Sequence, residues 1–167
     1  PLASLRAADL ERPGLVFEAG NCLYRTTGEN AGGGGMGSAY VLQRRTRGAD
    51  LDQVDTPAVG KVFHSEYLYQ LRTDEVTRRD HACVLVNMRS IGELDHPNLL
   101  PIYVSAPIAD NHLTVTPRQA ATLLHAVTAG ALPPRRRVEL LMDALRGLAR
   151  LHQAGFIHRD FTLRNVL

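Results

Sequence analysis

The chain has 167 residues, a hydrophobic fraction of 44% and a net charge of +2. These values predict a folded domain with a sizeable apolar core, and they argue against a nucleic-acid-binding or membrane-surface protein. No apolar run approaches the length that spans a bilayer, so no membrane segment is expected in this stretch. The two cysteines, Cys22 and Cys83, make no disulfide framework, which favours a cytoplasmic location for the domain.

The first 19 residues are interpreted as an N-terminal extension. They show weak helical patterning that is interrupted at Pro13–Gly14. The sequence begins with Pro1 rather than Met and shows no signal-peptide pattern, so it is interpreted as an excerpt of a longer protein.

The segments that follow indicate short strands separated by turns and polar connections. A glycine-rich loop is expected over residues 32–37, a polar surface connection over 44–57 and a turn over 107–111. Strands are expected over residues 22–27, 38–43, 58–63, 99–104 and 113–116.

Three helices are expected among and after these strands. The first runs over residues 66–94 and ends at His96–Pro97–Asn98. A short helix is expected over residues 119–127. A longer helix opens at Pro133–Pro134, carries apolar residues at helical spacing and ends near Gly155. This order predicts an α+β protein with a small antiparallel five-stranded sheet and one packed helix, followed by a helical region.

The glycine-rich segment fits the pattern G-x-G-x-x-G at Gly32, Gly34 and Gly37. A Walker-type phosphate loop requires Gly-Lys followed by Ser or Thr, but Gly60–Lys61 is followed by Val62. A dinucleotide-binding loop opens a helix, whereas these glycines lead into the strand-like sequence SAYVLQ. They therefore predict a hairpin whose backbone N–H groups face phosphate oxygens, with a simple flexible loop as the alternative.

Lys61 is the one lysine in a chain with 18 arginines. It lies within AVGKVF, on the strand after the hairpin, where a compact ammonium group can neutralise phosphate charge. The alternative interpretation is that its position is accidental.

The sequence His158–Arg159–Asp160, followed by Asn165, matches H-R-D-x-x-x-x-N. Phosphoryl transfer requires a carboxylate near the attacking hydroxyl and an oxygen ligand for Mg²⁺ a short loop away. The match follows an amphipathic helix that ends in LHQAGFI, and it therefore predicts a catalytic loop.

On these motifs, residues 21–167 resemble the eukaryotic-type protein kinases. HPNLLPIY, over residues 96–103, resembles the turn after helix C and the fourth strand of their N-lobe. The resemblance implies a kinase N-lobe and hinge over residues 20–118, after the extension of residues 1–19. It also implies the start of a helical C-lobe over residues 119–167, ending at the catalytic loop.

The resemblance further implies an ATP-dependent kinase that transfers the γ-phosphoryl group to a Ser/Thr or Tyr hydroxyl of a protein. Its cofactors would be ATP and Mg²⁺. Its partner would be a protein substrate and not a nucleic acid. Asp160 and Lys61 would be catalytic, Asn165 would bind the metal and Thr116 would be the gatekeeper before the hinge. The implied ATP-binding residues are Gly32, Gly33, Gly34, Gly35, Gly37, Ala39, Val59, Lys61, Thr116, Pro117 and Gln119.

The sequence departs from the kinase pattern in helix C, which in active kinases supplies a Glu to the strand-three lysine. Counting back ten residues from Pro97 gives Asn87, which can accept a hydrogen bond from Lys61 but supplies no charge. Counting forward from Lys61 leads instead to Arg79–Asp80, and Glu75 and Glu93 fit less well. Asn87 thus motivates the alternative of a pseudokinase, a nucleotide-binding or scaffold module.

Smaller departures affect the adenine slot and the catalytic loop. The roof over adenine would be Ala39 and Val59, an exchange of a large and a small residue that keeps the total volume of the slot. Thr162 and Arg164 leave the substrate hydroxyl type open.

A kinase-like phosphotransferase acting on a small molecule is a third alternative. The D-F-G segment would lie beyond Leu167, and this excerpt alone is expected to be inactive.

Overall fold

The structure of the chain is a computed structural model that describes residues 1–34, 37–48, 55–76, 78–79 and 90–167. The chain forms two compact units. The first consists of Pro1–Arg89 and Ile102–Arg118, and the second of Ser90–Pro101 and Gln119–Leu167.

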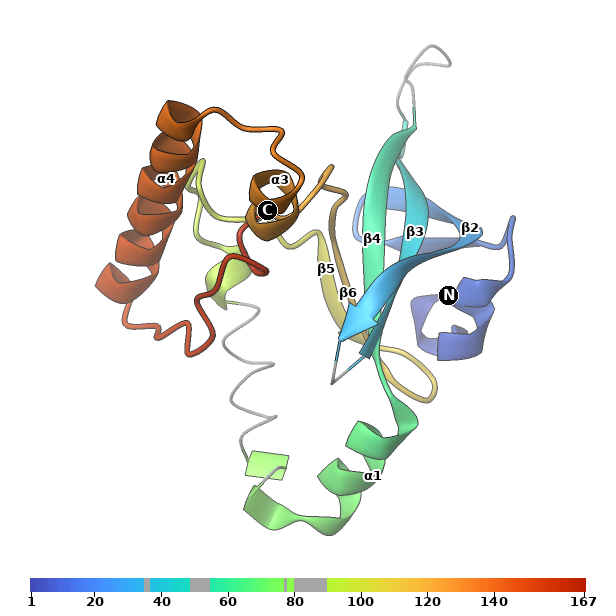
Figure 1. Cartoon of the computed structure of the whole chain (residues 1–167). Helices are drawn as coiled ribbons and strands as arrows, with labels where there is room; N and C mark the ends of the chain where they lie inside the picture. Colours follow the sequence, from blue (N-terminus) through green and yellow to red (C-terminus); the bar gives the residue numbers. More distant parts are fainter. Residues whose placement is uncertain (35–36, 49–54, 77, 80–89) are drawn as a thin grey trace. The chain divides into compact units, whose positions relative to one another are not determined.

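The first unit is built on a six-stranded antiparallel sheet (Figure 1). Its spatial strand order is β1-β2-β3-β4-β6-β5. The strands are β1 (Val16–Ala19), β2 (Cys22–Gly34), β3 (Gly37–Thr46), β4 (Thr56–Phe63), β5 (Val104–Pro107) and β6 (His112–Pro117). The predicted fold class is confirmed, although the sheet has one strand more than the predicted five.

The additional strand is β1, which lies within the predicted N-terminal extension. Its side chains alternate between exposed and buried, with Phe17 and Ala19 pointing into the core. Four residues are too short a run for this period of two to stand out beside the weak helical pattern of the preceding residues.

The predicted strand over residues 99–104 is wrong for most of its length, because β5 begins only at Val104. Pro101 has no backbone N–H to donate to a ladder. The first backbone bond on this side of the sheet is donated by Tyr103 N–H to the carbonyl of Val115, at 2.8 Å.

The hydrophobic core of the first unit lies on one face of the sheet. Leu42, Ala58, Leu113 and Val115 are fully buried there. Two 3₁₀ turns near the N-terminus, η1 (Leu2–Ser4) and η2 (Ala7–Glu11), belong to the same unit, and Leu10 is 0% exposed in this core. Figure 1 shows these blue turns beside the strands.

Hydrogen bonds join this N-terminal segment, residues 2–15, to the sheet and to the β5–β6 turn. Leu15 N–H donates to Thr26 Oγ1 at 3.0 Å, and the Tyr40 hydroxyl donates to Glu11 Oε1 at 2.8 Å. Ala109 N–H donates to the carbonyl of Leu5 at 2.9 Å. Burial, followed by the bond to Glu11, raises the pKa of Tyr40. The segment is therefore part of the packed lobe.

Helix α1 (Ser65–Thr73) follows β4 in the first unit. It begins one residue before the predicted long helix, but it ends where Asp74 takes an extended conformation, with φ −113° and ψ 119°. Residues 80–89, which include Asp80 and Asn87, lie outside the described residues.

The second unit contains α3 (Leu123–Thr128) and α4 (Pro134–Gln153). Pro134 occupies the first turn of α4 as predicted, and Gly155 follows its end with φ +85°. Helix α3 begins four residues later than predicted because Thr122 caps it, accepting a bond from His125 N–H at 3.2 Å. None of the helices in the described parts of the chain is long and apolar enough to cross a membrane.

The packing of the N-terminal segment predicts that Leu10→Ala lowers the free energy of unfolding by about 2–5 kcal/mol, because it leaves a cavity in the core. Val16→Ala, at a side chain that is 52% exposed, is the control and should cost well under half as much. Denaturant unfolding of the full-length protein measures both values. Equal, small losses would show that residues 2–15 do not contribute to the core.

Candidate functional site

Strands β2 and β3 form the predicted glycine hairpin. The ladder continues to the pair Gly34–Gly37, so the strands extend further into the glycine run than predicted. Gly32 has φ +110°, and a Cβ added at Gly37 would overlap the carbonyl oxygen of Val62. Glycine is thus required at both positions by backbone geometry. Gly35 lies outside the described residues.

The register of the sheet places four of the predicted ATP-binding residues on one face. Ala39 lies opposite Lys61, and Val59 lies opposite Thr116. Directly opposed residues of antiparallel strands share a face, and side chains two apart in a strand also share it. This face is the reverse of the core face. Ala39 and Thr116 are buried and Lys61 is exposed.

The described residues supply no acidic partner for Lys61. Glu75 pairs instead with Arg79, with 3.9 Å between Oε1 and Nη2. Glu93 is exposed and belongs to the second unit. The first-choice helix C position, Asn87, and its alternative Asp80 both fall outside the described residues.

The segment predicted as the hinge begins at the end of β6. The Arg118 N–H donates to the carbonyl of Pro57 at 3.2 Å, which continues the pairing of β6 with β4 beyond Pro117. The Arg118 side chain forms an ion pair with Glu29 on β2, with 2.8 Å between Nη2 and Oε1. Sequence reasoning missed this pair, because nothing local connects residues that are 89 positions apart.

The predicted catalytic loop brings Asp160 and Asn165 into direct contact. Asn165 Nδ2 donates to Asp160 Oδ2 at 2.8 Å and to the Asp160 carbonyl at 2.9 Å. The Asn165 N–H donates to the carbonyl of Thr162 at 2.9 Å. Among the described residues, Asn165 Oδ1 and Asp160 Oδ1 accept no hydrogen bond. The loop therefore presents one amide oxygen and one carboxylate oxygen outward from the same short turn.

Backbone bonds from α3 hold this loop in place. Leu123 N–H donates to the carbonyl of Val166 at 2.8 Å, and Leu124 N–H donates to the carbonyl of Leu163 at 3.0 Å. These donors belong to the first turn of a helix, which has no intrahelical acceptor for them. Arg159 has φ +62°, and the ring of His158 packs edge-on against Phe161 at 5.9 Å.

The HPN turn lies against α4 in the second unit. Asn98 N–H donates to Nδ1 of His96 at 3.1 Å. A Cβ added at Gly147 of α4 would overlap the carbonyl oxygen of Asn98. The missing side chain at Gly147 thus allows the turn to approach the helix that leads into the predicted catalytic loop.

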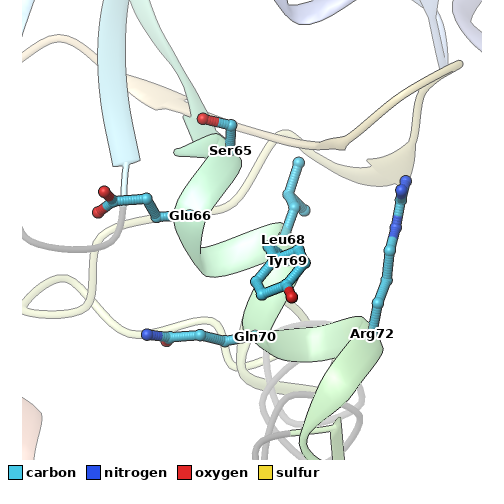
Figure 2. A pocket seen from close by; sticks show the side chains of 6 residues that line it. All are labelled: Ser65, Glu66, Leu68, Tyr69, Gln70 and Arg72. Atoms are coloured by element: carbon cyan, nitrogen blue, oxygen red, sulfur yellow. The ribbon is translucent and has the colours of Figure 1, made fainter.

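A hollow with a volume of about 810 Å³ lies on α1. Figure 2 shows its lining side chains, which all come from this one exposed helix: Ser65, Glu66, Leu68, Tyr69, Gln70 and Arg72. It contains none of the residues predicted to bind ATP, and a single helix does not enclose a ligand. The hollow is therefore not the nucleotide site.

Three features together are typical of a protein-kinase fold. They are the glycine hairpin, the lysine on the next strand and the HRD loop that follows a long helix in the sequence. The crystal structure of the Mycobacterium tuberculosis PknI kinase domain is similar, with a TM-score of 0.65 and 17% sequence identity. The match covers 92% of this chain and 56% of that kinase domain. The chain thus has the fold of part of a protein-kinase domain.

Serine/threonine-protein kinases are also similar in sequence. The chain is 29% identical over 136 residues to the serine/threonine-protein kinase pkn2 of Myxococcus xanthus and 28% identical over 138 residues to PrkC of Bacillus subtilis. Each match covers 81% of this chain, but only 15% and 19% of the two relatives. No family model matches the chain. The resemblance to protein kinases that the motifs indicated is confirmed.

The contact between α4 and the HPN turn predicts that Gly147→Ala is destabilising. In an unpacked helix interior, this change gains about 1 kcal/mol from helix propensity. Here the added methyl group would overlap the backbone of Asn98, and overpacking of this kind costs about 1–3 kcal/mol. Thermal unfolding of the full-length protein should show a lower Tm for Gly147→Ala. An exposed control on the same helix, Arg146→Ala, should leave the Tm nearly unchanged. A higher Tm for Gly147→Ala would contradict the close approach.

Proposed function

We propose that the chain carries the ATP-binding lobe and the catalytic loop of a serine/threonine-protein kinase. The observation that carries this proposal is the 2.8 Å contact between Asp160 and Asn165 within the H-R-D-x-x-x-x-N loop. The kinase fold and the names of the sequence relatives support it. The substrate would be a Ser or Thr hydroxyl of a protein, as the names of those relatives indicate.

The glycine hairpin and the face of the sheet that carries Lys61 would bind the nucleotide. Backbone N–H groups of Gly32–Gly37 would cover the phosphates, and the Lys61 ammonium would hold the α- and β-phosphates. Ala39 and Val59 would contact adenine, beside the gatekeeper Thr116. The exposure of Lys61 and its place opposite Ala39 support this assignment. Pro117 and Gln119 would offer backbone groups to the adenine edge.

The catalytic loop would orient the attacking hydroxyl. Asp160 Oδ1 accepts no bond among the described residues, so it is available to accept the proton of a substrate hydroxyl. Asn165 Oδ1 is likewise available, and a neutral amide oxygen is a ligand type that suits Mg²⁺. Mg²⁺, when bound, neutralises the charge that develops on the phosphate oxygens. The described residues contain no cluster of three or more His, Cys, Asp or Glu side chains that would hold a metal ion without substrate.

A nucleotide-binding module without phosphotransferase activity is the second candidate. The observation that favours it is the lack of an acidic partner for Lys61 among the described residues, together with Asn at position 87 of the sequence. Without a helix C glutamate, no carboxylate would hold Lys61 in place against the phosphates of ATP. A phosphotransferase for small molecules is a third candidate, and the HPN turn with the H-R-D–Asn spacing favours the protein-kinase alternative over it.

Turnover of Mg-ATP by the full-length protein tests the proposal. Asp160→Asn should lower kcat at least about 100-fold, because it removes the acceptor of the hydroxyl proton. Lys61→Met should lower kcat/KM by a similar factor, because a cationic contact to the phosphates is lost. Asp143→Asn, at a half-buried side chain, and Arg136→Met, at an exposed one, each remove a charge on α4; they are the matched controls and should retain activity.

We expect the wild-type enzyme to phosphorylate a protein substrate. Both site variants, Asp160→Asn and Lys61→Met, should lose this activity. Equal turnover in the wild type and both variants would contradict the assignment of the site. Binding of Mg-ATP without turnover by the wild type would instead establish the nucleotide-binding module.

The adenine slot predicts the effect of Val59→Ala. Because Ala39 is already small, a second small residue would leave the slot too wide, and the affinity for ATP should fall several-fold. Titration calorimetry with Mg-ATP measures the change, and the unfolding temperature verifies folding. A sharp gain in affinity with unchanged stability would show that the slot is not filled in this way.

A further inference from the structure

An ion pair joins the base of the glycine hairpin to the hinge segment. Glu29 lies on β2, three residues before Gly32, and Arg118 lies between the predicted hinge residues Pro117 and Gln119. Arg118 Nη2 lies 2.8 Å from Glu29 Oε1. Both side chains are about half exposed, at 41% and 54%. The contact therefore connects two elements that the proposed function places on either side of the nucleotide.

The ion pair spans a wide part of the sheet. Strands β3 and β4 lie between β2 and β6 in the strand order. With a strand spacing of about 4.8 Å, a flat sheet would hold β2 and β6 roughly 14 Å apart, a separation that only long side chains such as Arg and Glu can bridge. The contact thus crosses the two intervening strands, β3 and β4.

The face that the ion pair spans is the one that carries Lys61. The Arg118 N–H bond to the Pro57 carbonyl continues the β4–β6 register, so Arg118 lies opposite Pro57. Pro57, Val59 and Lys61 alternate onto the same face of β4. Arg118 crosses this face at the Pro57 end, away from Lys61 and beside the residues proposed to contact adenine.

We propose that Glu29 and Arg118 form a positioning pair that holds the glycine hairpin against the hinge and sets the affinity for adenine nucleotides. This inference rests on the proposed function of the same site. The two residues act by fixing the hairpin and the hinge, and they touch none of the reacting atoms. An exposed ion pair contributes a factor of up to about five to an equilibrium constant, so its loss should weaken binding by that order.

Other ion pairs of the lobe provide a matched control. Arg47 and Glu18 lie at the β1 edge of the sheet, 3.4 Å apart between Nη2 and Oε1, with exposures of 64% and 53%. This pair is also exposed, and it reaches past one strand, β2, whereas the Glu29–Arg118 pair reaches past two. It does not contact the hairpin tip or the hinge, so its loss should leave nucleotide affinity unchanged.

Titration of the full-length protein with Mg-ATP tests the positioning pair. Glu29→Gln and Arg118→Gln should each raise the Kd about two- to fivefold, and the double variant should be no weaker than the weaker single one. The reversed pair, Glu29→Arg with Arg118→Glu, should restore the Kd to within about twofold of wild type. Glu18→Gln should bind like the wild type. In turnover, KM should rise with the Kd while kcat stays unchanged. Unfolding temperatures within a few degrees of wild type would confirm that the exposed substitutions leave the lobe folded.

Unchanged Kd values in both single variants, or a reversed pair that binds as weakly as they do, would overturn the positioning pair alone. Failure of the wild type to bind Mg-ATP at all would overturn the proposed function as well. The two failures are therefore distinguished by the wild-type titration.

Discussion

The register between β3 and β4 is the constraint on which the proposed nucleotide site depends. It sets Lys61 opposite Ala39, and a slip of one residue would turn Lys61 onto the core face. Apolar packing on the reverse face holds this register, since Leu42 and Ala58 are opposed and both fully buried. Gly60 contributes by its lack of a side chain, because an added Cβ would lie 2.9 Å from Leu42 Cδ1. The burial that stabilises the lobe therefore also fixes which face presents the lysine.

In the second unit, the position of the predicted catalytic loop depends on contacts with helices rather than with a sheet. The first N–H groups of α3 have no partner within the helix and bind the carbonyls of Leu163 and Val166. The HPN turn packs against α4 at Gly147, in the helix that leads into the loop. Short local bonds then set Asn165 against Asp160. The exposed loop is thereby held by backbone bonds to α3, and rigid elements commonly position the side chains of loops in this way.

Local signals in the sequence predicted most of this arrangement. Pro134 and Gly155 marked the ends of α4, and the segments SAYVLQ and AVGKVF marked β3 and β4. The H-R-D–Asn spacing predicts a catalytic loop. Long-range contacts could not be predicted in this way. Strand β1 and the packing of Leu10 depend on a sheet face formed by residues much later in the chain, and the Glu29–Arg118 pair joins residues that are 89 positions apart. No strand forms over residues 99–103, because the apolar run there is interrupted by Pro101, which has no N–H to donate.

The central claim is that a nucleotide binds with its phosphates beside Lys61. Because Lys61 is the only lysine of these 167 residues, a lysine-directed probe reports on it cleanly. An acyl phosphate of ATP transfers its acyl group to an amine that lies beside the bound phosphates, and mass spectrometry of the full-length protein then locates the modified residue. The account predicts acylation of Lys61 that excess Mg-ATP suppresses. Absence of acylation at Lys61, or acylation that Mg-ATP does not suppress, would contradict it.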